Sequence, residues 1–122
     1  MSSRRVGPVR LYRADDSVLL TGSIEVAAKF GDRLRGLLGR DSLPADAGLL
    51  LSGVNGVHTF GMAFPIDVVF IDAEGKVLKV IASMSPARIE RAVPGGQSCL
   101  ELAAGAAARY GIEAGVRLRF GA

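Results

Sequence analysis

The sequence predicts a mainly β fold, a small β sandwich or distorted barrel with two short helices. Short apolar segments with strand-like alternation recur along the chain, and turn-forming residues separate them, which is the pattern of many short strands. The chain also has 16 Gly and no Trp, a composition that favours frequent turns. Only two stretches change to a spacing or composition typical of helices.

The first predicted strands lie at residues 9–12, 17–21 and 23–27. The polar turn Ala14-Asp15-Asp16 separates the first two, as expected for a hairpin. In residues 30–38 the apolar positions fall at i, i+4, i+7 and i+8, which is one face of a helix. Asp32 is a candidate cap for this helix, and Gly39 is well placed to end it.

The remaining predicted elements are strands at 49–51, 66–71, 77–82, 98–102 and 116–120, and an Ala-rich helix at 103–110. The clearest hairpin joins 66–71 to 77–82 through the tight connection 72–76. Both faces of 77–82 are largely apolar, so we expect that strand to be central in its sheet. Residues 83–97 contain two Pro and two Gly and are predicted to form a long loop.

A chain of 122 residues has the length of one domain. We divide it into a basic N-terminal arm with the first strand, residues 1–16, and a single mainly β domain, residues 17–122. The arm contains Arg4, Arg5, Arg10 and Arg13, and the rest of the chain is nearly neutral, with 11 basic and 12 acidic residues. We interpret the arm as solvated rather than as a phosphate-binding element.

Several classes of protein are disfavoured by composition. No stretch has the roughly 18 apolar residues that a membrane helix requires, and no apolar segment of about 7 to 15 residues follows the first arginines, as it would in a secretory signal. The single cysteine, Cys99, cannot form an internal disulfide. These features predict a cytoplasmic protein in a reducing compartment, without a membrane partner.

Residues 57–72 form the most chemically dense part of the chain, with its only histidine and three of its five phenylalanines. Five residues are candidate ligand-binding groups: His58, Thr59, Phe60, Met62 and Asp67. The glycines that precede and follow His58 place it in a loop that can turn the imidazole outward. If this protein has a site, we expect it here.

Asp67 has two readings, because it begins an apolar strand where an unpaired charge would be costly. In the structural reading, which we favour, it accepts backbone amide hydrogen bonds or pairs with Arg35 or Arg40. In the functional reading it acts with His58 as an acid and base pair. No second carboxylate or nucleophile is positioned by spacing to support that pair.

No metal, cofactor or catalytic residue is predicted. His58, Met62 and Cys99 are soft ligands of the kind that hold Cu(I), but no Cys-x-x-Cys or His-x-x-x-His spacing supports a metal site. Cys99 lies inside an apolar predicted strand, where cysteines behave as small inert hydrophobic residues.

Several spaced motifs resemble, in order, the prokaryotic family catalogued as domain of unknown function 192. They are Arg35-Gly36-Leu37-Leu38-Gly39-Arg40, Gly48-Leu49-Leu50-Leu51, His58-Thr59-Phe60-Gly61-Met62, Pro65-Ile66-Asp67-Val68-Val69-Phe70-Ile71-Asp72 and Leu100-Glu101-Leu102-Ala103-Ala104-Gly105. The resemblance implies a small β sandwich with two short helices, but no agreed activity, substrate or catalytic residue. The family's commonest pattern has Trp where this chain has Gly61 and a basic residue where it has Ala63.

The sequence therefore leaves the function unknown and favours a non-enzymatic ligand-binding or protein-interaction module whose surface is formed by residues 58–64 and the predicted loop 83–97. Its partner would be a small ligand or a protein. Two alternatives remain. One is a hydrolase-like enzyme with an acid and base site at His58 and Asp67. The other is a DNA-binding homodimer, suggested by a short likeness of residues 102–118 to swapped-hairpin transcription factors, although nucleic acid is not the expected partner.

Overall fold

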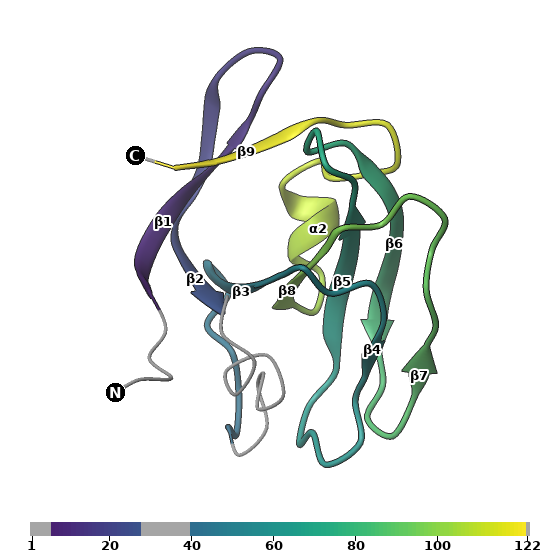
Figure 1. Cartoon of the computed structure of the whole chain (residues 1–122). Helices are drawn as coiled ribbons and strands as arrows, with labels where there is room; N and C mark the ends of the chain where they lie inside the picture. The colour runs from purple at the N-terminus through teal and green to yellow at the C-terminus, as the bar shows by residue number, and fades with distance from the viewer. Residues whose placement is uncertain (1–5, 28–39, 122) are drawn as a thin grey trace.

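The computed structural model describes residues 6–27 and 40–121 of the chain. Within them the fold is mainly β, as predicted, and has one short helix (Figure 1). The elements are β1 (Val6–Arg13), β2 (Val18–Ala27), β3 (Ala47–Ser52), β4 (Val57–His58), β5 (Ile66–Ile71), β6 (Val77–Met84), β7 (Ile89–Glu90), β8 (Ser98–Ala103), α2 (Ala106–Arg109) and β9 (Leu118–Gly121). The helix predicted at residues 30–38 lies outside the described residues.

Seven strands form one mixed sheet in the order β6-β5-β8-β3-β2-β1-β9, and β4 pairs separately with β7. The β2–β3 pair is parallel and the other pairs are antiparallel. The sheet curls but does not close into a complete barrel. A bridge between Lys76 and Arg117 and a 2.8 Å hydrogen bond from the amide of Leu118 to the carbonyl of Gly75 join its two ends at one corner.

The β5–β6 hairpin confirms the prediction made from its turn residues. In the turn, Asp72 Oδ1 accepts hydrogen bonds from the amides of Glu74 and Lys76, each at 2.9 Å, and Gly75 has a φ of 88°. The predicted central position of the second strand is wrong, because β6 is at an end of the seven-strand order. Leu78 and Ile81 of β6 pack against the second core cluster described below. Both faces of β6 are therefore apolar, although one of its edges is unpaired in the sheet.

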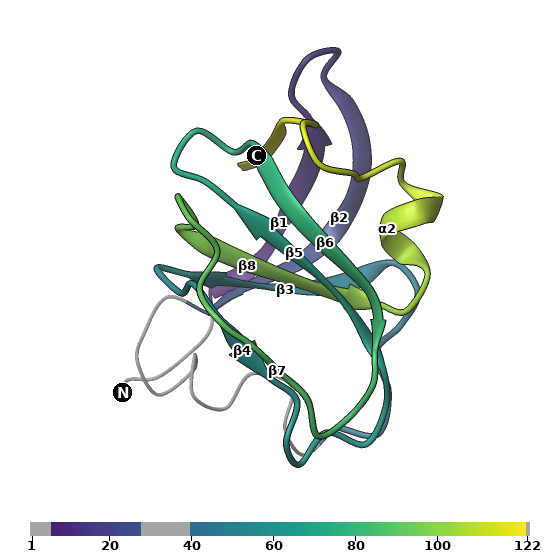
Figure 2. The ribbon, with the colours of Figure 1, turned by 90° about the vertical axis from the view of Figure 1, so that its right-hand side faces the viewer.

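Two core clusters lie on opposite faces of the curved sheet. The first contains Leu11, Val69, Leu100 and Leu102 together with Ala106 and Ala107 of α2 and other buried residues. The second contains Ile66, Val68, Phe70 and Cys99, and residues beside β4 and β7 pack against it. Figure 2 shows the resulting layers, with α2 on one side of β5, β8 and β3 and the β4–β7 pair on the other.

The structure corrects several predicted elements. Residues 83–97 are not one loop, because β6 continues to Met84 and β7 forms within the segment and pairs with β4. Strands of two residues are too short to show alternation, so neither β4 nor β7 was predicted. The predicted helix at 103–110 is shorter, since Ala103 still belongs to β8 and Gly105 has a φ of 90°.

The first strand is longer than predicted and has a neighbour on each side. β1 begins at Val6 rather than at residue 9, and it lies between β2 and β9. Arg10 and Arg13 are therefore part of the sheet. In the described part of the chain, the one helix is four residues long, and it lacks the length and apolar character needed to cross a membrane.

Candidate functional site

Thr59 is a buried hydrogen-bonding centre that fixes the loop between β6 and β7 to the segment after β4. Its side chain is fully buried, and Oγ1 donates to the carbonyl of Ser85 at 2.7 Å and accepts from the amide of Arg88 at 2.8 Å. Its backbone adds a bond from its amide to the carbonyl of Arg88 and one to its carbonyl from the amide of Ala87. Thr59, proposed from sequence as a ligand-binding residue, thus joins the segment after β4 to the loop before β7 through buried hydrogen bonds.

The residues on either side of Thr59 are exposed and form an apolar and aromatic surface. The rings of His58 and Phe60 lie 5.7 Å apart between centroids at an angle of 33°. His58 is directly opposite Ile89 in the β4–β7 ladder, so their side chains lie on the same face. Phe60 and Ile89 are each 49% exposed. We call His58, Phe60 and Ile89 the His58 patch.

The surroundings of the His58 patch combine apolar support with positive charge. Met62 is half-buried and packs against the second core cluster. Arg88 and Arg91, which flank β7, are exposed, and neither forms an ion pair with another described residue. Ala87 has a φ of 64°, a backbone conformation that costs energy for a residue with a side chain and is enriched at functional sites.

Asp67 lies on the opposite face of the sheet from the His58 patch. Its carboxylate is fully buried. Oδ1 accepts a 2.8 Å hydrogen bond from the amide of Ser83, and Oδ2 accepts bonds from the amides of Gly105 at 3.1 Å and Ala107 at 2.9 Å. Since α2 belongs to the first core cluster and β4 lies against the second, the structure does not bring Asp67 and His58 together.

The hydrogen bonds of Asp67 follow from the local geometry of β5, β6 and α2. β5 and β6 change register between the Ile66–Met84 and Val68–Ile81 pairs, which is a bulge that leaves an amide without its usual partner. The carboxylate accepts that amide and also the orphan amides at the start of α2. The structure therefore supports the amide-accepting role for Asp67, and among the described residues Arg40 pairs with Glu25 instead.

Cys99 is buried on β8, and its thiol donates to the carbonyl of Val54 at a sulfur–oxygen distance of 3.4 Å. Burial raises the pKa of Cys99 from 9.0 to about 11, so the reactive thiolate is suppressed. Within residues 6–27 and 40–121, no three His, Cys, Asp or Glu side chains gather in a way that could hold a metal ion.

Two results are expected for Cys99. Ellman's reagent should fail to label it in the folded protein near neutral pH, and labelling should follow unfolding. Because its pKa is higher when folded, the folded state retains the proton longer, and stability should fall as pH rises from about 9 towards 11. Cys99→Ala should lose this dependence on pH in chemical denaturation curves. Rapid labelling of the folded wild-type protein by Ellman's reagent would contradict the burial of the thiol.

Sequence reasoning proposed His58, Phe60 and Met62 together with the segment 83–97, but it did not single out Ile89 or Arg88 within that segment as neighbours of His58. Both lie in the segment predicted as a loop, where a single apolar residue between two charged ones gives no periodic signal. Only the pairing of β4 with β7 places them beside His58.

A family model described as an uncharacterised ACR matches residues 12–120. The chain belongs to the DUF192 family. This confirms the resemblance found in the motifs, and it leaves the activity open because the family is uncharacterised. A comparison of this DUF192 protein with functionally curated proteins returned no match.

Two solved structures are similar to this DUF192 protein. One, a protein of unknown function from Novosphingobium aromaticivorans, is 19% identical with a TM-score of 0.77, over 97% of this chain and 94% of the other. The second, from Sinorhizobium meliloti, is described as a candidate transcription regulator. It is 25% identical with a TM-score of 0.74, over 98% of this chain and 96% of the other. Both share the fold across nearly the whole chain.

Proposed function

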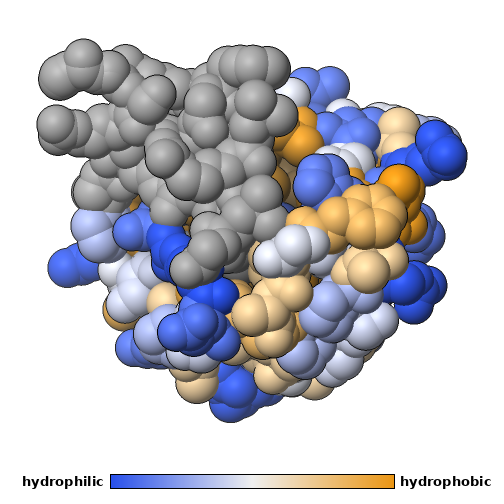
Figure 3. Space-filling view, turned by 90° about the horizontal axis from the view of Figure 1, so that it is seen from below, coloured by the Kyte–Doolittle hydropathy of each residue, from blue (hydrophilic) through white to orange (hydrophobic). Residues whose placement is uncertain are grey.

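We propose that this DUF192 protein is a non-enzymatic interaction module that binds a protein partner through the His58 patch. The observation that carries this proposal is the paired exposure of Phe60 and Ile89, each 49% accessible, around the ring of His58. Clustered exposed apolar groups mark interaction sites more often than isolated ones do. Seen from the end of the molecule that carries the loops after β4 and before β7, hydrophobic groups gather on one side among hydrophilic ones (Figure 3).

The patch is presented on a fixed backbone, which lowers the entropy lost on binding. Thr59 bonds the two segments that carry Phe60 and Ile89, so both side chains start from restrained positions. The exposed Arg88 and Arg91 beside β7 favour a partner whose rim is acidic. Aromatic and arginine side chains are also the groups that dominate the energy of many interfaces.

Two other functions receive less support from the geometry. A hydrolase-like site would require His58 and Asp67 to converge, and they lie on opposite faces of the sheet. A regulatory role, such as that given to the Sinorhizobium meliloti protein, is compatible with an interaction module, because a regulator acts through its partners. A reducing cytoplasmic location stays a prediction from the single cysteine.

Replacing Phe60 with Asp should weaken partner binding by about 30-fold, the loss of roughly 2 kcal/mol typical of an interface hot spot. The partner can be identified by placing a photoreactive phenylalanine at position 60 and isolating the crosslinked species. Its affinity for the wild type and the variant is then measured by titration calorimetry. Because Phe60 is half exposed, the variant should remain folded.

Leu19→Asp is the matched control, because Leu19 is 50% exposed and lies on β2 in the hairpin with β1. It introduces the same charge at the same exposure away from the patch, and it should leave affinity unchanged. Equal loss of affinity in both variants, or no loss for Phe60→Asp, would contradict the proposal.

A further inference from the structure

A second surface, on the outer face of β1 and β9, carries a row of arginines. Tyr12 is directly opposite Arg119, and Arg10 is directly opposite Gly121. Residues two apart in an extended segment share a face. Arg10 therefore lies on the same face as Tyr12, and Arg117 lies on the same face as Arg119. The interior-facing neighbours Leu11 and Leu118 are buried, which places the arginines on the outside. We call Arg10, Arg117 and Arg119 the arginine row.

The arginine row is open and its charges are not neutralised by the described part of the chain. All three side chains are exposed, and none forms an ion pair with a described residue. The nearby carboxylate of Asp16 is engaged by Arg13 at 3.0 Å. Gly22 lies beside the stem of Arg10 and Gly121 beside the guanidinium of Arg119, so no side chain from these positions covers either one.

One member of the row is held in place. The guanidinium of Arg119 lies 3.9 Å from the centroid of the Tyr12 ring, a distance at which a cation is attracted to an aromatic face. A guanidinium restrained in this way loses less freedom when it binds an anion, and its planar fork suits phosphate oxygens.

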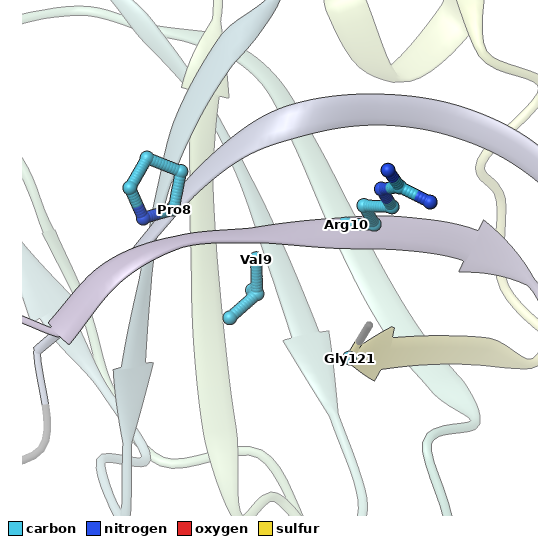
Figure 4. Close-up of a pocket in the computed structure, with 4 residues that line it drawn as sticks. All are labelled: Pro8, Val9, Arg10 and Gly121. Atoms are coloured by element: carbon cyan, nitrogen blue, oxygen red, sulfur yellow. The ribbon is translucent and has the colours of Figure 1, made fainter.

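A cavity that is widely open to solvent adjoins the row beside β1. It has a volume of about 470 Å³ and is lined by Pro8, Val9, Arg10 and Gly121. Pro8 and Arg10 extend from one side of the strand and Val9 from the other (Figure 4). Apolar Pro8 thus lies on the same side of β1 as the cation of Arg10, and Val9 packs against the first core cluster.

We propose that the arginine row and this cavity bind single-stranded nucleic acid, with the arginines on successive phosphates and a base in the cavity. The arginines follow one another at steps of two residues, about 7 Å along the strands, a spacing that suits the repeating phosphates of an extended strand. An apolar pocket beside a cation suits a base attached to that backbone. An acidic protein would satisfy the charges but would leave the cavity without a specific role.

The test is fluorescence anisotropy with a labelled oligothymidylate and the full chain. Three phosphate contacts predict a logarithmic salt slope of about 2, so affinity should fall roughly 15-fold between about 50 and 200 mM salt. Arg10→Gln with Arg119→Gln should weaken binding more than tenfold and reduce the slope to that of about one contact. The corresponding double lysine variant preserves charge and should keep the slope.

Lys79→Gln with Arg109→Gln is the matched control, since it removes the same charge from exposed side chains of β6 and α2, outside the arginine row and the His58 patch. Little change in this control supports the proposal. Equal loss in both double variants would show an effect of net charge alone and overturn it, as would absence of binding at low salt. Competition by polyglutamate as strong as by unlabelled oligothymidylate would assign an acidic protein instead, and tighter binding of duplex DNA would overturn the single-strand assignment.

Discussion

Replacing Asp67 with Ala should lower the free energy of unfolding by about 3 to 5 kcal/mol, as expected when a buried charged acceptor is removed and its donors stay buried. Three backbone amides, from Ser83, Gly105 and Ala107, would lose their acceptor together. They belong to the β6 bulge and to the start of α2, so one substitution should loosen two elements that this side chain bonds together. Urea denaturation of the purified variant measures the change.

Asp72→Ala is the matched control for this prediction. Asp72 also accepts two backbone amides, but in a turn at the surface, where water can replace it. Its loss should cost about 1 kcal/mol. His58→Ala should cost less than about 0.5 kcal/mol, because the imidazole is exposed. If His58→Ala destabilised the fold as much as Asp67→Ala, the histidine would belong to the packed framework and not to a binding surface.

The second large effect is expected at Thr59. Thr59→Val keeps the volume of the side chain but removes the hydroxyl that bonds the carbonyl of Ser85 and the amide of Arg88. These partly buried bonds would both be lost, at a cost of about 2 kcal/mol. The loop before β7 should also open more often, so hydrogen exchange at the amides of Ala87 and Arg88 should accelerate relative to the rest of the sheet.

Thr59→Ser separates the hydroxyl from the methyl group. It retains both hydrogen bonds and should cost only about 1 kcal/mol for the buried methyl, with exchange at Ala87 and Arg88 unchanged. The two variants should also differ in binding, because only valine releases the segment that carries Ile89. A valine variant as stable as the serine variant would show that the hydroxyl bonds are dispensable.

Local patterns predicted the parts of this fold that depend on near neighbours in sequence. The strand at 66–71 and its hairpin agree with β5 and its turn, since the mostly apolar segment and the turn residues both lie within a few positions. The position of β6 at the end of the sheet was not predictable in this way. Apolar residues on both faces of β6 indicate that both faces pack against other parts of the protein, but they do not show whether both edges of the strand are paired.

The candidate site was predicted in part, for a similar reason. His58 and Phe60 were found because polar chemistry and aromatic residues are dense there in the sequence. Thr59 and Asp67 were grouped with them by proximity in the chain, but their alternation and their hydrogen-bond partners place one beneath the patch and the other across the sheet. Ile89 joins the patch only through a tertiary pairing, which no local window contains.

The ladder between β1 and β9 sets the order in which the chain can fold. The β1–β2 hairpin is local and can form early, but the second neighbour of β1 comes from the last residues of the described chain. Loop closure over such a separation is entropically costly, and folds dominated by distant pairings form slowly. During synthesis one edge of β1 therefore stays unpaired until β9 is available. Pro8 cannot donate a backbone hydrogen bond, so this unpaired edge is a poorer template for association with other chains.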